Sequence, residues 1–424
     1  MNILYILRHN PWGIGGGCYA CRCYLDAFTE VFKGAHLDVC ICEEYLNGKE
    51  NGFLRSTGAQ ARELGVPFTV NGLPNKNKGK NNGDGNVNFI RVAQRNKMEK
   101  VLSPMTGLLH RFDSTARKML ESQKYDFCIF DHNSIAGPLV ELCKKQGVKT
   151  IVINHNCEAE YYRDNYDWLH RMFFFNHVKR VERQSYLGCD YNIFLTEEDK
   201  NLFGQVYGKS STRSVVTGCF EAPSNSPSRG EESLPFAVYG LQGNGNGRLR
   251  LVISGTIGNV QNMDGIQYFL DELLDCVPKK AEVVIAGKNP PEELKVQIEG
   301  LNREGHYTQV TLIPNPVNIL EIVSSCDIFV CPTRLGGGLK LRVMDGLKAG
   351  LPVIAHQVSA RGYTEFAKQG FLWAFDSKQG FADALHEVVQ KRDDHELNRT
   401  NIQDFADQQF SFESKVEMLK NTIV

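Results

Sequence analysis

The sequence predicts an α/β fold made of two doubly wound parallel sheets, and three observations support this prediction. Short apolar runs alternate with segments of helix length along the whole chain. The runs are apolar at consecutive positions, which is typical of strands that helices cover on both faces. The 424 residues are enough for two to three domains of ordinary size.

The first half contains six strand candidates. The opening run, residues 2–7, ends at a glycine loop, and a helix-length segment follows to about residue 32. Helices are also predicted over residues 134–145 and, as one long helix, from residue 158 to about residue 186. The other strand candidates are residues 36–41, 68–70, 126–130, 150–154 and 191–195.

The second half repeats the same alternation, which predicts a second parallel sheet. Its strand candidates are residues 250–254, 282–286, 309–313, 328–331 and 352–355. The helices predicted between them cover residues 263–276, 291–301, 319–324 and 339–348.

Two segments that interrupt the pattern set the predicted domain organisation. Residues 75–88 are rich in Asn, Gly and Lys, which predicts a flexible loop inside an N-terminal domain of residues 1–215. Residues 223–247 are rich in Ser, Pro, Gly and Asn and are interpreted as a linker at the start of a second domain, residues 216–400. Residues 401–424 are predicted to form one or two helices.

Composition excludes several classes of protein. A formal net charge of −1 argues against a dedicated nucleic-acid binder. No run approaches 18 consecutive apolar residues, and the N-terminus lacks the basic start of a signal peptide. The thirteen cysteines are scattered, which favours free, buried thiols in a reducing compartment. We therefore expect a cytoplasmic protein.

Two features suggest contact with an anionic membrane. Residues 76–118 hold ten basic and three acidic residues, and residues 168–175 form an aromatic-rich helical stretch. Basic charge near exposed aromatic side chains is typical of peripheral binding to anionic lipid. Taken singly, the two features are better explained by a solvated loop and by ordinary core packing. The hypothesis is a peripheral location at the inner face of the membrane.

The first candidate site residues follow predicted strands of the N-terminal domain. Gly16 and Gly17 open a helix after the first strand, where backbone N–H groups can approach a ligand closely. His155 follows the strand that ends at Asn154, and a histidine there can bind a sugar hydroxyl or move a proton. A tight turn and an ordinary polar histidine remain the alternatives.

The richest segment is residues 332–350, PTRLGGGLKLRVMDGLKAG, in which three glycines stand between a strand and a helix. Glycine N–H groups, together with Lys340 and Arg342, favour an anion such as a diphosphate. Asp345 lies about one helical turn beyond Arg342 and is suited to ribose hydroxyls. Gly255 and Thr256, after the first strand of the second half, suit a diphosphate and equally a plain turn.

These stretches resemble the GT-B glycosyltransferases, in particular the retaining group 1 (family 4) enzymes. The resemblance rests on the opening strand with its glycines, on VINHNCEAEYYR, on SGTIGNVQNMDGIQYF, and on residues 331–355 with GLPVIAH. It implies two Rossmann-like domains facing a cleft. The first would lie on the acceptor side, the second would bind a nucleotide sugar, and the final helix would cross back to the first.

The resemblance also implies roles for individual residues. His155 would touch the transferred sugar, and Lys340 and Arg342 would stabilise the leaving diphosphate. Asp345 would hold the ribose, and Val317 would meet the base through its backbone. The other implied donor-binding residues are Gly16, Gly17, Gly255, Thr256, Gly337, Gly338 and Leu339.

The expected reaction is transfer of a sugar from a nucleotide-diphosphate sugar to a hydroxyl of a glycan or lipid-linked acceptor, without a metal or other cofactor. Polysaccharide, cell-surface glycan or glycolipid synthesis is the expected setting. Gly337 stands where the family often has its first glutamate, which leaves the donor sugar and full activity open. A GT-B-like epimerase and a non-catalytic nucleotide-sugar-binding protein are the alternatives.

Overall fold

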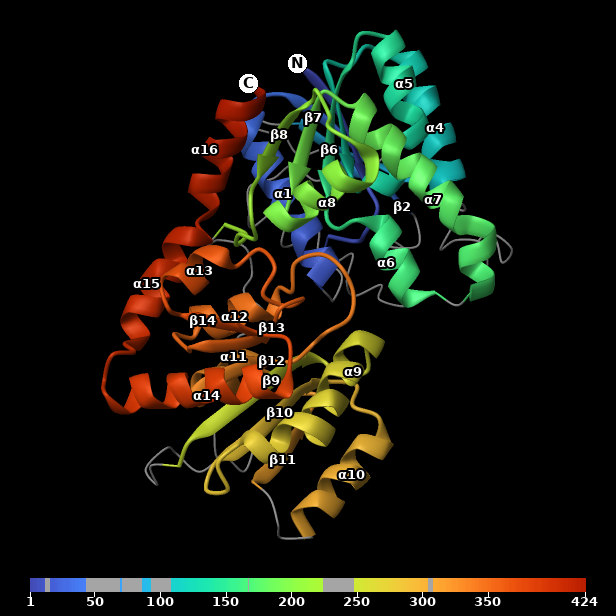
Figure 1. The fold of residues 1–424 in the computed structure, drawn as a ribbon. Coiled ribbons are helices and arrows are strands. Elements are labelled where there is room, and N and C mark those ends of the chain that lie inside the picture. Colours follow the sequence, from blue (N-terminus) through green and yellow to red (C-terminus); the bar gives the residue numbers. More distant parts are fainter. Residues whose placement is uncertain are drawn as a thin grey trace. The chain divides into compact units, whose positions relative to one another are not determined.

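The computed structural model describes residues 1–11, 16–42, 69–70, 86–92, 108–166, 168–223, 248–303 and 308–424. The chain forms two compact units. Met1–Pro227 and Ser411–Val424 make up the first unit, and Ser228–Phe410 make up the second. Each unit is built on one parallel sheet with helices around it, so the predicted α/β class is confirmed (Figure 1).

The first sheet has eight strands among the described residues, in the order β3-β4-β2-β1-β5-β6-β7-β8. Every neighbouring pair is parallel, so all strands end at the same edge. The order reverses direction between β1 and β5. The strands are β1 (Asn2–Leu7), β2 (His36–Cys42), β3 (Thr69–Val70), β4 (Asn86–Val92), β5 (Phe127–Asp131), β6 (Lys149–Asn154), β7 (Tyr191–Phe194) and β8 (Arg213–Val216).

Helices cover both faces of this sheet, as its continuous apolar strands require. Leu4 and Ile6 of β1 belong to a core cluster with side chains of α4 and α5, whereas Tyr5 packs on Phe28 of α1. The helices are α1 (Gly16–Val31), α4 (Leu108–Ser122), α5 (Gly137–Lys145), α6 (Glu158–Asn165), α7 (Trp168–Gly188), α8 (Glu197–Tyr207) and α16 (Phe412–Ile423).

In the part of the second unit that the structure describes, the sheet has six parallel strands in the order β11-β10-β9-β12-β13-β14. This is the order of a Rossmann fold, with its reversal between β9 and β12. The strands are β9 (Arg250–Thr256), β10 (Glu282–Lys288), β11 (Gln309–Pro314), β12 (Ile328–Cys331), β13 (Val353–His356) and β14 (Leu372–Phe375).

The helices of the second unit also surround their sheet. Leu251 and Ile253 of β9 pack in a buried cluster with Phe269, Leu294 and Phe381. Helix α9 (Val260–Tyr268) continues as a π turn and a 3-10 turn to Cys276. The other helices are α10 (Glu292–Arg303), α11 (Ile319–Ser324), α12 (Arg342–Lys348), α13 (Thr364–Lys368), α14 (Lys378–Asp393) and α15 (Arg399–Gln409).

The prediction of one long helix from residue 158 to 186 is wrong, because the chain turns at Tyr166, whose backbone is extended. The reason is a buried tertiary contact. Glu182 of α7 accepts hydrogen bonds from the backbone N–H groups of Glu158 and Ala159 at the start of α6. In a continuous helix residues 158 and 182 would be about 36 Å apart, so this contact needs two helices.

Two further segments differ from their predictions. Residues 86–88 belong to β4, so the predicted loop 75–88 is wrong there, while its remainder lies outside the described residues. The linker prediction for residues 223–247 also falls outside them beyond Pro223. The C-terminal residues form α15 in the second unit and α16 in the first, where α16 packs against α1 (Figure 1).

No helix among the described residues is long and apolar enough to span a membrane. None of the twelve cysteines whose side chains are described forms a disulfide, and ten of them are buried. Cys21 and Cys23 of α1 are among the buried ones, consistent with small apolar residues in a packed helix.

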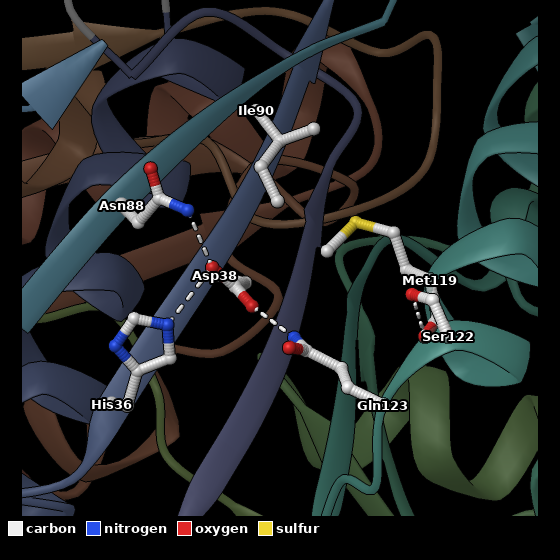
Figure 2. A pocket seen from close by; sticks show the side chains of 7 residues that line it. All are labelled: His36, Asp38, Asn88, Ile90, Met119, Ser122 and Gln123. Carbon is white, nitrogen blue, oxygen red and sulfur yellow. Dashed lines mark hydrogen bonds and ion pairs between the residues drawn. The ribbon is translucent and has the colours of Figure 1, made fainter. Parts of the chain in front are cut away.

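A cavity of about 380 Å³ opens at the amino ends of β2 and β4, beside the end of α4 (Figure 2). Asp38, which is 2 % exposed, lies at its floor. Asp38 accepts hydrogen bonds from Asn88 Nδ2 at 2.7 Å, Gln123 Nε2 at 2.6 Å and Tyr125 Oη at 2.7 Å, and His36 Nε2 lies 3.1 Å away. Because both carboxylate oxygens are occupied, we interpret the cluster as structural.

Replacing Asp38 with Ala should lower the free energy of unfolding by about 2–4 kcal/mol, because it leaves several buried donors without an acceptor. Denaturant unfolding followed by circular dichroism measures the change. Glu141→Ala, at an exposed position of α5, is the control and should change stability little. Equal stabilities of the two variants would contradict a structural role for Asp38.

Candidate active site

Charged and aromatic side chains gather where the strand order of the first sheet reverses. Arg8 and His9 directly follow β1, and Asp131 and His132 stand at the end of β5, the next strand in the sheet. His155 follows β6, which pairs with β5. Ligands of open α/β sheets bind at the carboxyl ends of strands beside such a reversal. The topology therefore brings these residues to the expected position for a ligand.

His155 is held by a buried carboxylate. Its Nε2 lies 2.5 Å from Oδ1 of Asp131, which is fully buried. The other oxygen of Asp131 accepts a hydrogen bond from Tyr5 Oη at 3.0 Å. The imidazole of His155 is stacked on that of His132, with 5.4 Å between ring centroids, and the Tyr24 ring meets it edge-on at 5.8 Å. The ring is fixed in position and orientation.

A second group of contacts surrounds His132. Arg8 Nη1 lies 2.9 Å from His132 Nδ1 and donates to Ser134 Oγ at 2.8 Å. Glu158 Oε1 lies 3.1 Å from both Arg8 Nη1 and His132 Nε2. The backbone of His132 has a φ of 137°, which a non-glycine residue rarely adopts. Such backbone strain is found preferentially at functional sites.

Burial and positive charge keep these histidines neutral. Burial, followed by the charge of Arg8, holds the pKa of His132 well below its usual value. The same two causes, in the same order, lower the pKa of His9 from 6.5 to about 3. At neutral pH both rings are therefore hydrogen-bonding groups without charge.

The start of α6 rests on another buried acid. Glu182 accepts hydrogen bonds from the N–H of Glu158 at 2.6 Å, from Asn133 Nδ2 at 2.8 Å and from Tyr207 Oη at 2.5 Å. Burial raises the pKa of Glu182 to about 7. This carboxyl sets the position of Glu158, which in turn contacts Arg8.

Cys21, Asp131 and His155 offer sulfur, oxygen and nitrogen atoms that all lie within 4.8 Å of one another. Zinc accepts all three kinds of ligand. Hydrogen bonds account for the close approach, because Asp131 is bonded to His155 and accepts from the Cys21 thiol. Burial and the Asp131 charge raise the pKa of that thiol well above its usual value, which disfavours the thiolate that a metal needs.

The second unit has its own cluster where its strand order reverses, between β9 and β12. Gly255 in β9 has a φ of 141°, and a Cβ there would lie 3.4 Å from Arg342 Nη1. Arg342 also donates to Asn262 Oδ1 and, at 3.3 Å, to Thr333 Oγ1. Asn262 Nδ2 donates to the Thr256 carbonyl at 2.7 Å. The guanidinium is thus held beside a glycine at the carboxyl edge of the sheet.

The glycine-rich segment is a loop and not the start of a helix, since α12 begins only at Arg342. Gly336 and Gly338 have φ values of 82° and 71°, which favour glycine. Lys340 is 7 % exposed, and its Nζ lies 3.3 Å from the Gly337 carbonyl and 3.2 Å from Gln261 Oε1. The ammonium group of Lys340 therefore stabilises the loop by bonding its backbone carbonyls.

The remaining residues of the predicted site lie in different elements of the two units. Asp345 is partly buried on α12, one turn after Arg342, and Val317 is 57 % exposed between β11 and α11. Leu339, which is partly buried, also stands in the loop before α12. Gly16 and Gly17 are the exposed first residues of α1, and a Cβ at Gly17 would lie 3.6 Å from the His9 ring. Their roles stay predictions.

Residues 250–391 match the model of the family described as glycosyl transferases group 1. The match begins at β9 and includes the whole cluster around Arg342. This segment belongs to the group 1 glycosyltransferases. The match supports the glycosyltransferase activity that the sequence predicts.

Solved structures show that the chain has the GT-B fold. Sucrose-phosphate synthase from Thermosynechococcus elongatus has a TM-score of 0.63 at 14% identity, over 99% of this chain and 97% of that one. Anabaena HepE in complex with UDP gives 0.62 at 14%, over 100% and 99%. WaaG, a glycosyltransferase involved in lipopolysaccharide biosynthesis, gives 0.61 at 15%, over 100% and 99%. None of the curated protein sequences is significantly similar to this chain.

Arg8 and His9 were not among the site residues predicted from the sequence. The sequence did contain a signal for these two residues, because both directly follow a continuous apolar strand. The sequence-based prediction also missed that Asp131 binds His155, since the two residues are 24 positions apart and meet only through strand pairing. Arg334, which binds Asp264 at 3.0 Å and stacks on Tyr268 at 4.5 Å, was missed as well.

The low pKa of His9 makes the protein sensitive to acid. Because the folded-state pKa lies below the unfolded value, its stabilising contribution is complete above pH 6.5 and is lost as pH falls towards 3. The free energy of unfolding should decrease between pH 7 and pH 5.5. In His9→Gln this decrease should be about 1 kcal/mol smaller than in the parent. Denaturant unfolding at both pH values measures it.

The control for this prediction is His386→Gln, at an exposed position of α14, which should retain the full loss on acidification. An unchanged loss in His9→Gln would show that His9 is not the group that takes up the proton.

Proposed function

We propose that the protein transfers a sugar from a nucleotide-diphosphate sugar to an acceptor hydroxyl, without a metal ion and with retention of configuration at the sugar. The observation that carries the proposal is the guanidinium of Arg342, held beside Gly255 where the strand order of the second sheet reverses. A fixed cation beside a glycine at this edge suits a diphosphate.

The diphosphate is the leaving group of the proposed reaction. The bond between the anomeric carbon and a diphosphate oxygen breaks, the acceptor oxygen bonds to that carbon, and the hydroxyl proton leaves with the diphosphate. Arg342 would stabilise the negative charge that grows on the leaving oxygen. Lys340 adds positive charge beside the loop and donates to the carbonyls of Gly336 and Gly337.

The remaining donor contacts follow from position in the second unit. Thr256 ends β9 beside Gly255 and would add a hydroxyl to the diphosphate site. Asp345, one turn beyond Arg342, would accept hydrogen bonds from the ribose hydroxyls, and the exposed backbone at Val317 would meet the base. Uridine diphosphate sugars are the first donors to test, because HepE has been solved with UDP and with UDP-glucose.

The first unit would supply His155 as a hydrogen-bonding partner for a hydroxyl of a sugar substrate. The acceptor is proposed to be a glycan or a lipid-linked sugar. The likeness to WaaG, a protein of lipopolysaccharide biosynthesis, supports a setting in polysaccharide, cell-surface glycan or glycolipid synthesis. Retention of configuration rests on the match to group 1.

A peripheral contact with an anionic membrane is part of the proposal, and it rests on the start of α7. Trp168, Leu169, Met172 and Phe173 are between 47 % and 67 % exposed. Their spacing of one, four and five residues places them on one side of the helix. Arg171 is exposed beside them, and exposed basic and aromatic groups together favour anionic lipid.

Thermal-shift measurements with UDP, GDP, ADP, CMP and their sugars, in the presence of EDTA, test the donor site. One nucleotide should raise the melting temperature of the parent, since it binds only the folded protein. Arg342→Ala and Asp345→Ala should each weaken its binding by about 10- to 100-fold. Arg303→Ala, at a site 80% exposed, is the control and should bind like the parent.

Two outcomes would contradict the donor proposal. One is that no nucleotide raises the melting temperature. The other is that the Arg342 and Asp345 variants both bind like the parent.

Flotation with vesicles that contain anionic lipid tests the membrane contact. The parent should float at low salt and less at high salt, because salt screens the basic groups. Phe173→Glu should reduce flotation strongly, whereas Val296→Glu, at a similarly exposed position on α10, should not. Absence of flotation at low salt, or equal flotation of the two variants, would refute the contact.

A further inference from the structure

Asp131 is a buried acid that contacts His155 and determines which ring nitrogen of that histidine carries the proton. Its side chain is fully buried and accepts hydrogen bonds from Tyr5 Oη, from the Cys21 thiol and from His155 Nε2. The His155 contact, at 2.5 Å, is shorter than the Tyr5 contact, at 3.0 Å. A carboxylate can only accept, so the proton of this contact lies on Nε2 of His155.

This contact also determines the second ring nitrogen. With the proton on Nε2, a neutral imidazole keeps Nδ1 as an acceptor. Stacking on His132 and the edge of Tyr24 prevent the ring from turning over. The side chain of His155 is about 10% exposed, so part of the ring can still reach a ligand.

We propose that Asp131 is a positioning residue for sugar transfer, which holds His155 in the one tautomer whose Nδ1 accepts a hydrogen bond from a sugar hydroxyl. The inference rests on the proposed function, which gives His155 a sugar hydroxyl as its partner. Asp131 itself touches no substrate and acts through His155.

Two substitutions in this unit distinguish a positioning role of Asp131 from a merely structural one. Asp131→Asn keeps the shape of the side chain but offers an amide that can either accept from or donate to His155. Tyr5→Phe removes a different hydrogen bond of Asp131 with little change in volume and leaves the contact with His155 intact. Both sites are fully buried.

Imidazole nitrogen spectra of protein labelled with ¹⁵N at histidine measure the tautomer without any substrate. The parent and Tyr5→Phe should show His155 protonated on Nε2. Asp131→Asn should show a mixture or the Nδ1-protonated form, and His155→Ala assigns the signal. An unchanged tautomer in Asp131→Asn would overturn the inference, whether or not the donor is known.

Nucleotide release from UDP-glucose supplies the kinetic test. Asp131→Asn should lower kcat by roughly 10- to 100-fold with KM for the donor nearly unchanged, and Tyr5→Phe should stay close to the parent. The double variant with His155→Ala should lose no more than His155→Ala does, because the two residues act as one unit. Equal losses in Asp131→Asn and Tyr5→Phe would show a merely structural role and overturn the inference.

His155→Ala separates this inference from the proposed function. If His155→Ala retains the activity of the parent, the proposed role of His155 fails and the inference fails with it. If His155→Ala loses activity while Asp131→Asn retains it, only the positioning role of Asp131 fails.

Discussion

Parallel strand pairing is the constraint on which both units depend. It forces all strands of a sheet to end at one edge, so the residues that follow separate strands become neighbours. Where the strand order reverses, successive helices leave on opposite faces of the sheet, and the strand ends are left uncovered. The reversals between β1 and β5 and between β9 and β12 therefore locate the two clusters of polar side chains. Apolar residues on both faces of the strands keep the sheets rigid beneath them.

The buried acids of the first unit show how polar groups are accommodated in this core. Asp38, Asp131 and Glu182 are each nearly or fully buried, and each accepts several hydrogen bonds. An unpaired charge at these depths would cost several kcal/mol, so the donors around each acid are needed for folding. The three networks differ in what they join. Asp38 joins strands to the end of α4, Glu182 joins α7 to α6, and Asp131 joins β5 to the residue that follows β6.

The second cluster depends on backbone shape as much as on charge. Gly255 lies beside the Arg342 guanidinium, and the loop with Gly336 and Gly338 folds over Lys340. Glycine is needed at these positions because the backbone takes positive φ values there. The sequence indicated the glycines and both cations. It did not indicate that Lys340 would lie beneath the loop while Arg342 lies beside Gly255, since side-chain burial depends on the packing of the entire unit.

The sequence by itself determined the fold class, the positions of most strands, and the segment that carries the group 1 match, because apolar runs and glycine-rich turns are local signals. Strands such as β4, β8 and β14 were missed, since they are short or stand beside polar residues. Only the tertiary structure decided that residues 158–188 form two helices and that Asp131 holds His155. Both outcomes depend on hydrogen bonds between residues 23 or 24 positions apart. Such contacts form only when distant segments pack side by side, and no local pattern of residues records them.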